Sequence, residues 1–351
     1  RIQIEGVGYM KKMLIGVLVA VLVLGVAVFS VAAQDEIKIC QVTDLGGVDD
    51  KSFNETAWNG IKMAETELGI KGIVLESKSD ADYMVNIDQF IDDGCDLIVT
   101  VGFMLQEATE TAATDNPDVK FSIIDSAVGM DNVVDQVFQT DEAAFLAGYA
   151  AAAMTKTGTV GTYGGMCIPT VTIFMDGFAR GVAYYNEAKG TDVKVLGWDL
   201  EKQDGTCVDS FDDLDKGKQT TIAMMDQGAD IIMPVAGPVG GGTIAAIEDR
   251  GTGMVIGVDS DWALTYPDSA KIILTSVVKK MDATTLDVIK SVVDGKFAGG
   301  KVVGTLANQG VGIAPFHEFD AEISDELKAE LADIEAKIIS GDITLNEAFI
   351  Q

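Results

Sequence analysis

A carboxylate-rich turn near the start of the chain carries the residue types best suited to recognising a small molecule. The segment reads Val42-Thr43-Asp44-Leu45-Gly46-Gly47-Val48-Asp49-Asp50-Lys51-Ser52-Phe53-Asn54. Its three aspartates would repel a phosphate, but they can accept hydrogen bonds from hydroxyls or from the N–H groups of a base. Phe53 stands in an otherwise polar loop, where its ring can stack on a planar ring. The turn therefore indicates a site for a neutral, hydroxylated, aromatic small molecule.

The residues around this turn predict a strand before it and a helix after it. The apolar run 37–42 predicts a buried first strand, and Ser52 or Asn54 can cap a helix running from 55 to about 68. A polar turn between a strand and a helix is where an open α/β sheet presents its ligand site. The turn has acids where a G-x-G-x-x-G loop or a P-loop lysine would stand, so it does not predict a phosphate cradle.

Apolar, β-prone runs alternate with helical patterns along the rest of the chain. In a first series, strands are predicted at 72–75, 97–101, 121–124 and 133–138, with helices near 83–92, 105–113 and 141–154. In a second series, strands are predicted at 159–163, 193–196, 231–235 and 254–258, with helices near 172–188, 216–227 and after Gly242. A return segment adds strands at 271–275, 301–303 and 310–313 and helices at 280–293 and 324–339. This alternation predicts parallel sheets joined by right-handed crossovers.

Chain length and element order predict two lobes. We expect an α/β fold, a bilobed clamshell with two doubly wound parallel-sheet lobes and several hinge crossovers. The first lobe is expected at 34–155 and the second at 156–270, with 271–351 returning to complete the first lobe and the hinge. Glycine-containing junctions at 155–158 and 298–300 are the predicted hinges.

The start of the sequence predicts an export signal. Lys11 and Lys12 precede an unbroken apolar run at 13–29, and the small residues Ser30-Val31-Ala32-Ala33 follow. This order is typical of a secretory signal, with Met10 as the expected start and cleavage after Ala33, so that residues 1–33 are removed. The run is near the lower length limit for a spanning helix, so an uncleaved N-terminal anchor is the alternative. Both interpretations place the protein outside the cytoplasm.

The net charge excludes some classes of partner, and the cysteines indicate whether disulfides can form. A formal net charge of −30 argues against nucleic acid and anionic lipid as partners. Four cysteines in an exported chain permit disulfides, and three pairings are possible. The combination of Cys40–Cys95 with Cys167–Cys207 keeps each bridge within one lobe. We predict the second bridge, whereas Cys40 and Cys95 can equally be buried free thiols.

The sequence offers little for catalysis. Its one histidine, His317, has no partner motif, and we interpret it as structural. No CxxC, HExxH or GxSxG pattern and no Walker lysine occurs. We therefore expect no enzyme activity, no cofactor and no bound metal.

A set of motifs in a fixed order resembles one known family. They are the first-turn segment, Val101-Gly102-Phe103, Phe145-Leu146-Ala147-Gly148-Tyr149, Phe174-Met175-Asp176-Gly177-Phe178, Gln227-Gly228-Ala229-Asp230, Gly257-Val258-Asp259-Ser260-Asp261 and 274–282. From about 37 to 319 the chain resembles the basic membrane protein family, purine-nucleoside-binding lipoproteins of ATP-binding-cassette importers. The resemblance implies a periplasmic-binding-protein clamshell of type I, with three interlobe crossovers. It further implies a nucleoside held between the lobes and delivered to a membrane permease, and we expect a monomer.

The resemblance also assigns roles to individual residues. Phe53 matches the ring that stacks on the base, and Asp44 and Asn54 match polar positions of the same turn. Asp125 matches the carboxylate expected to read the N–H groups of the base. Phe174 is the best candidate for the wall opposite Phe53.

The remaining implied positions lie in the second lobe and in the return segment. Asp259 and Lys279 match the residues that hold ribose hydroxyls, and Lys279 beside Asp259 would balance charge in a closed cleft. Gly237 falls in a turn that approaches the ligand through its backbone.

Two departures and two alternatives accompany this interpretation. No cysteine suits a lipid anchor, and the segment 198–210 is longer than the usual loop, which leaves contacts from Phe211 unassigned. One alternative is a receptor of the same fold for a sugar or a furanose-type ligand. The other is an exported nucleoside hydrolase, which would need a metal cluster of the kind that Asp44, Asp49 and Asp50 superficially offer.

Overall fold

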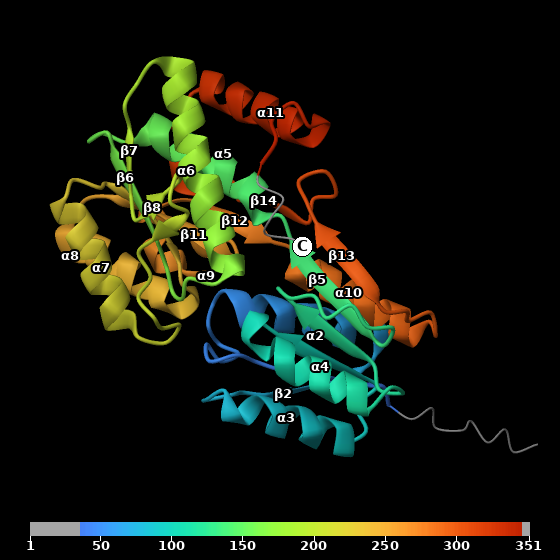
Figure 1. Cartoon of the computed structure of the whole chain (residues 1–351). Helices are drawn as coiled ribbons and strands as arrows, with labels where there is room; N and C mark the ends of the chain where they lie inside the picture. Colours follow the sequence, from blue (N-terminus) through green and yellow to red (C-terminus); the bar gives the residue numbers. More distant parts are fainter. Residues whose placement is uncertain (1–35, 346–351) are drawn as a thin grey trace, which may run out of the picture. The chain divides into compact units, whose positions relative to one another are not determined.

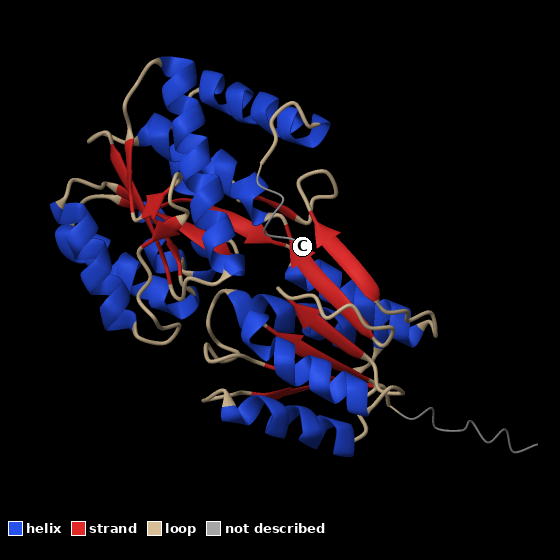
Figure 2. Cartoon of the chain, in the orientation of Figure 1, coloured by secondary structure: helices blue, strands red, loops and turns tan. Residues whose placement is uncertain are grey.

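Two six-stranded sheets form the framework of residues 36–345, the part of the chain that a computed structural model describes (Figures 1 and 2). The predicted export signal and Met10 lie outside these residues. The first sheet has the order β13-β5-β4-β3-β1-β2, and all its pairings are parallel. Its strands are β1 (Lys38–Val42), β2 (Lys71–Leu75), β3 (Leu97–Val101), β4 (Phe121–Ile124), β5 (Val133–Phe138) and β13 (Gly300–Gly304).

The second sheet repeats this arrangement, with the order β14-β12-β11-β10-β6-β7. Its strands are β6 (Thr159–Gly164), β7 (Lys194–Leu196), β10 (Ile231–Val235), β11 (Met254–Asp259), β12 (Ile273–Lys279) and β14 (Val311–Ile313). Only β14, at the edge, is antiparallel to its neighbour. Strand β4 of the first sheet thus corresponds to β11 of the second, a structural repeat with no clear counterpart in the sequence.

Helices cover both faces of each sheet, because alternate residues of each strand point to opposite faces. In β1, Ile39 packs with α2 (Phe53–Leu68), whereas Cys40 packs with α3 (Ala81–Asp92) and α4 (Gln106–Asp115). Around the second sheet lie α5 (Thr140–Met154), α6 (Pro169–Lys189), α7 (Leu214–Asp226), α8 (Gly240–Arg250), α9 (Trp262–Thr265) and α11 (Asp325–Ser340). Helix α10 (Met281–Val293) packs on α2 of the first lobe. The doubly wound α/β fold is as predicted.

The chain passes between the lobes three times: from β5 to α5, from β12 to α10, and from β13 to β14. The hinges predicted at 155–158 and 298–300 are wrong, because neither segment lies between the sheets. The first is fixed inside the second lobe by the Asp230 carboxylate, which accepts hydrogen bonds from Thr155 Oγ1, Lys156 N and Thr157 N at 2.5, 2.7 and 3.1 Å. The second leads into β13, where Gly299 N donates to Asp131 O at 3.0 Å.

The segment after residue 270, expected to complete the first lobe, is divided between the lobes. Strands β12 and β14 join the second sheet, whereas α10 and β13 join the first lobe. The strand predicted at 271–275 begins at Ile273, after a 3₁₀ helix (Pro267–Ile272), and continues to Lys279. This longer strand carries Lys279 to the carboxyl edge of the sheet.

Both disulfides of the one-bridge-per-lobe pairing are present. Cys40 is bonded to Cys95 in the first lobe, and Cys167 to Cys207 in the second. Cys40 and Cys95 are therefore not free thiols.

Candidate ligand-binding site

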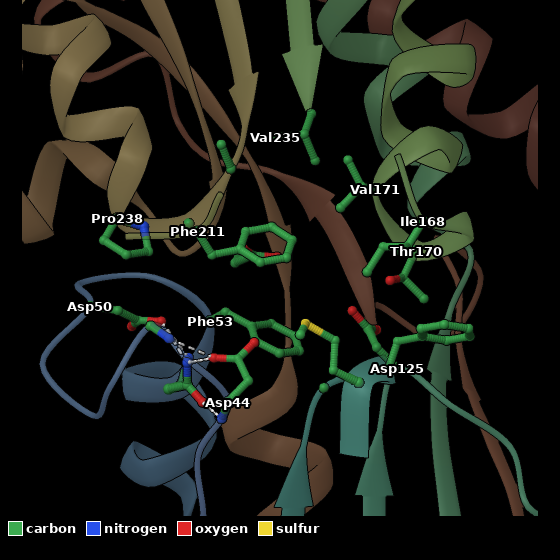
Figure 3. A pocket seen from close by; sticks show the side chains of 18 of the residues that line it. Asp44, Asp50, Phe53, Asp125, Ile168, Thr170, Val171, Phe211, Val235 and Pro238 are labelled. Carbon is green, nitrogen blue, oxygen red and sulfur yellow. Dashed lines mark hydrogen bonds between the residues drawn. The ribbon is translucent and has the colours of Figure 1, made fainter. Parts of the chain in front are cut away.

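A cavity of about 560 Å³, counting the solvent at its mouth, lies where the carboxyl ends of strands from both sheets meet (Figure 3). This is the edge at which open α/β sheets bind ligands. All eight residues that we predicted as ligand-binding line the cavity: Asp44, Phe53, Asn54, Asp125, Phe174, Gly237, Asp259 and Lys279. They come from six segments that are far apart in the sequence, with Asp44, Phe53 and Asn54 all in the first turn.

The first turn is organised by Asp50. Its Oδ1 accepts hydrogen bonds from the backbone N–H groups of Ser52 and Glu55 at 2.9 and 3.0 Å, and its Oδ2 accepts from Asn54 N at 2.8 Å. These are N–H groups that the start of α2 leaves without helical partners. The prediction that the Ser52 or Asn54 side chain caps this helix is therefore wrong. Both side chains instead contact aspartates that line the cavity, Ser52 at Asp259 and Asn54 at Asp44.

Asn54 holds Asp44 in place. Asn54 Nδ2 donates to Asp44 Oδ1 at 2.7 Å, and Asn54 Oδ1 accepts from Asp44 N at 3.3 Å. Gly46 N also donates to Asp44 Oδ1, at 3.0 Å. Among the described residues, no group donates to the other carboxylate oxygen, Oδ2. A Cβ on Gly102 would lie 3.2 Å from this Oδ2 and 3.5 Å from the Phe53 ring, so Gly102 lets the two side chains approach each other.

A buried ion cluster connects the lobes on the other side of the cavity. Lys279 Nζ bonds Asp125 Oδ2 of the first lobe and lies 3.3 Å from Asp259 Oδ1 of the second. Asp125 and Asp259 have the left-handed φ values of 62° and 67°, which are uncommon outside glycine. Ser52 Oγ lies 3.1 Å from both Asp259 Oδ2 and Val258 O, either of which can accept its proton. Among the described residues, no group donates to Asp125 Oδ1.

Burial sets the protonation of these groups. It raises the pKa of Asp44 and of Asp125, although the nearby Lys279 ammonium opposes the rise at Asp125. For Lys279, burial lowers the pKa, but Asp125 and Asp259 together outweigh it and leave the pKa raised. Lys279 therefore stays charged, since an ammonium flanked by two carboxylates is the arrangement that offsets the cost of burial.

Aromatic rings form the remaining walls. Lys279 Nζ lies 4.8 Å from the ring centroid of Phe53 and 5.2 Å from that of Phe174. Phe174 is only 1% exposed, whereas Phe53 and Phe211 are half-buried. Figure 3 shows the Phe211 ring on the second-lobe side of the cavity, facing Phe53 on the first-lobe side. The sequence left Phe211 unassigned, because the path of its long loop, and so the position of the ring, could not be inferred from the sequence.

Other lining residues were also missed, among them Met104, Ile168, Thr170 and Val171. Met104 directly follows the motif Val101-Gly102-Phe103. The position of this motif at the end of a predicted strand could have indicated that Met104 lines the site. Ile168, Thr170 and Val171 surround the start of α6, where Pro169 is the first helical residue. Ile168 and Val171 add apolar lining on the second-lobe side of the cavity, and Thr170 adds a hydroxyl group there (Figure 3).

The long segment 198–210 is ordered by contacts on the second lobe. Strands β8 (Trp198–Asp199) and β9 (Asp204–Gly205) form a small hairpin. The fully buried Asp176 of α6 accepts hydrogen bonds from Trp198 Nε1 at 3.2 Å and Gln203 Nε2 at 2.7 Å.

His317 Nε2 lies 2.7 Å from Asp261 Oδ2, a structural contact outside the cavity lining.

The family model that describes ABC transporter substrate-binding proteins of the PnrA-like type matches residues 37–348. The chain belongs to this family. The family resemblance predicted from the motifs is confirmed, and the protein is a substrate-binding protein of an ABC transporter rather than an enzyme. Members of the family are extracytoplasmic solute-binding proteins.

Individual relatives agree with this assignment. The chain is 34% identical to basic membrane protein A of Borreliella burgdorferi over 312 residues, covering 87% of this chain and 86% of that protein. It is 32% identical to the ABC transporter nucleoside-binding protein BmpA of Lactococcus lactis, with 89% and 90% covered. An ABC transporter solute-binding protein structure from Aeropyrum pernix superposes with a TM-score of 0.79 at 31% identity, covering 88% and 93% of the two chains.

Residues 36–345 contain neither a helix that could span a membrane nor a cluster that could bind a metal ion. No helix in this part is both long and apolar enough to cross a membrane. No group of three or more His, Cys, Asp or Glu side chains in this part is arranged to hold a metal ion. Asp44 and Asp50 instead direct carboxylate oxygens at N–H groups of their own turn.

Proposed function

We propose that this substrate-binding protein captures a purine nucleoside between its lobes and delivers it to the membrane permease of an ATP-binding-cassette importer. The observation that carries the proposal is the pair of rings, Phe53 and Phe211, that face each other across the cavity. A planar base fits between two rings, and stacking stabilises each base by about 1–3 kcal/mol. A sugar alone would leave such rings without a planar partner.

Phe211 replaces Phe174 as the proposed second wall. Phe174 is almost completely buried, and its ring lies near the ammonium of Lys279. A ring in that position supports the charged cluster and closes the end of the cavity. Phe211 is only partly buried, so a ligand can cover its ring.

The ion cluster suits the ribose. Asp125 Oδ1 accepts no hydrogen bond from the described residues, and Lys279 brings a cationic donor next to it. A carboxylate and an ammonium side by side can bind the two hydroxyls of a vicinal diol, one as acceptor and one as donor. This revises the role expected for Asp125, which lies with Asp259 and Lys279 rather than apart from them.

The base edge then faces the first turn. Asp44 Oδ2 also accepts no hydrogen bond from the described residues, and both this oxygen and the Phe53 ring lie next to Gly102. It can accept from an N–H or amino group of a stacked base. Asn54 fixes its orientation, so we assign Asn54 a positioning role.

The charge of the cavity favours a nucleoside over a nucleotide. Among the described residues, four aspartates line it, and the one cation of this lining, Lys279, is already bound to two of them. A phosphate would meet unpaired carboxylates with no free cation.

Two measurements test the proposal. Mass spectrometry of small molecules released from denatured protein should identify a nucleoside, and calorimetric titration should give binding of adenosine, guanosine or inosine. The matching 5′-monophosphates should bind at least about tenfold more weakly, the equivalent of about 1.4 kcal/mol. Binding of a sugar with no heat from any nucleoside would contradict the proposal and favour a sugar receptor of the same fold.

A further inference from the structure

We propose that the Cys167–Cys207 disulfide is a positioning element of the ligand site, which holds Phe211 opposite Phe53 and thereby sets ligand affinity. The inference rests on the proposed function, because it takes Phe211 as a wall against which the base stacks. It assigns the bond a role in binding in addition to any role in stability.

Each cysteine of this disulfide is close in sequence to a residue that lines the cavity. Cys167 directly precedes Ile168, which lines the cavity, and Cys207 precedes Phe211 by four residues. The bond therefore joins the segment at the start of α6 to the segment that carries the stacking ring. No other disulfide of the described residues constrains this region, because the second one joins Cys40 and Cys95 in the first lobe.

Backbone hydrogen bonds define the place to which the disulfide fixes the segment. Gly164, the last residue of β6, donates from its N–H to Thr206 O at 2.9 Å and accepts from Val208 N at 3.0 Å. Ser210 N donates to Gly165 O at 3.2 Å. Residues 206–210 thus run along the end of β6 as a short added edge, and the disulfide lies in the middle of this pairing.

Two glycines leave the space that this arrangement needs. A Cβ on Gly164 would lie 2.9 Å from Cys207 Sγ, and a Cβ on Gly165 would lie 2.4 Å from Cε1 of Phe211. The Phe211 ring is therefore packed directly on the Gly165 backbone. A shift of the 206–210 segment along β6 would move the ring out of its place facing Phe53.

The hairpin at the other end of the loop does not replace this constraint. Asp176 anchors Trp198 and Gln203, which precede Cys207 by nine and four residues. Between Gln203 and the start of α7 at Leu214, three backbone bonds and the disulfide hold the chain to residues 164–167, and Thr206 N donates to Gly197 O at 2.9 Å, before Cys207. Backbone bonds at an edge open locally far more easily than a covalent bond breaks.

The test compares nucleoside affinity in variants with and without the bond. Cys167→Ser/Cys207→Ser should weaken binding by about 5- to 20-fold, a part of the roughly 5- to 150-fold expected when Phe211→Ala removes the stacking ring. In the triple variant the loss should stay within about twofold of Phe211→Ala alone, because a bond that acts through Phe211 has nothing left to position. Full additivity in this cycle would overturn the proposal.

The first-lobe disulfide supplies the matched control. Cys40 and Cys95 are 55 residues apart, against 40 for Cys167 and Cys207, so the chain-entropy model gives their removal at least as large a loss of stability. Cys40→Ser/Cys95→Ser should nonetheless leave the nucleoside dissociation constant within about twofold. An equal loss of affinity in both variants would mean that general destabilisation, not the position of Phe211, is responsible.

Two further measurements keep the proposal testable. Gly165→Ala retains both cysteines but displaces the ring, so it should weaken nucleoside binding as the double serine variant does. Hydrogen exchange of ligand-free protein should show faster exchange at Val208 and Ser210 in the double serine variant only, whatever the ligand is. If the unaltered protein binds no nucleoside, the proposed function fails; if it binds and the double serine variant binds equally well, the positioning role fails.

Discussion

Asp125 and Asp259 occupy equivalent places in the two sheets and share one ammonium group. Asp125 follows β4 and Asp259 ends β11, the third strand from the corresponding edge of each sheet. Both have left-handed backbone, which turns each carboxylate out of its strand direction toward Lys279. The first lobe therefore contributes one carboxylate to this cluster, and the second lobe contributes the other carboxylate and the ammonium group.

Lys279→Met should destabilise the ligand-free protein by about 3–5 kcal/mol, because it leaves two buried carboxylates without a cation. Lys279→Met/Asp125→Asn should cost less than the sum of its single variants, since the second change removes one of the unpaired charges. Urea denaturation measures these differences in the free energy of unfolding. Both single variants should also bind nucleoside more weakly.

An exposed ion pair provides the control for this cycle. Lys290 Nζ lies 3.2 Å from Glu67 Oε2 with both side chains partly exposed, so Lys290→Met should change stability by about 0–1 kcal/mol. Strict additivity of the Lys279 and Asp125 variants would mean that the two residues act independently.

Much of the fold was predictable from local patterns, because buried parallel strands between helices leave a strong signal. The strands β3, β4, β5 and β10 begin and end as predicted. The crossovers were not predictable, because glycine-containing junctions mark close approach as readily as they mark a hinge. Gly299 shows this: a Cβ there would lie 2.4 Å from Asp131 O within the first lobe.

The site residues were predictable where a side chain follows the end of a strand. They were less predictable where the side chain lies in a long irregular loop. Asp44, Asp125 and Asp259 each stand at a strand end, where the sequence pattern points. Phe211 lies in an irregular segment whose course depends on a disulfide and on backbone pairing with β6. The capping role of Asp50 was missed because its carboxylate reaches N–H groups up to five residues later in the chain.

Phe53→Ala should weaken nucleoside binding by about 1–3 kcal/mol, the scale of base–aromatic stacking. The protein should remain folded, because Phe53 is half-buried at the first position of α2 and faces the cavity. Calorimetric titration measures the loss, and Phe53→Tyr, which keeps the ring, serves as the control. Unfolding of the alanine variant would instead make Phe53 a packing residue.

Contacts outside the cavity lining should slow ligand release. Ser260 Oγ of the second lobe donates to Lys51 O of the first at 2.9 Å, and Lys51 Nζ lies 4.7 Å from the ring centroid of Tyr266. Lys51→Met should raise the dissociation rate about 2- to 5-fold with little change in the association rate, because an exposed cation–π contact is worth about 0.5–1 kcal/mol.

Stopped-flow displacement of bound nucleoside measures this rate. Lys62→Met, on the exposed face of α2, is the matched control for loss of one positive charge. A lower association rate with unchanged dissociation would assign Lys51 to the capture of the ligand rather than to closure of the lobes.

Asp141 should make stability fall as pH rises. It is 3% exposed in the first turn of α5, and its Oδ1 has no hydrogen-bond partner among the described residues. Burial, with smaller contributions from Glu142 and Asp176, raises its pKa from 3.8 to about 7. Between about pH 4 and 7 the folded protein keeps a proton that the unfolded chain has released, so the free energy of unfolding decreases through this window and levels off above it.

Asp141→Asn removes this proton uptake while keeping the shape of the side chain. About two pKa units of this window lie above pH 5, so at about 1.4 kcal/mol per unit the variant should gain about 3 kcal/mol over the unaltered protein between pH 5 and pH 8. Asp50, whose pKa burial also raises to about 7, retains its own contribution, so part of the slope should persist in the variant. Urea denaturation at several pH values measures the difference, with the exposed Asp118→Asn as control. A stability difference that is the same at pH 5 and pH 8 would show that Asp141 is charged in the folded protein throughout this range, and that its unpaired oxygen is tolerated as an anion.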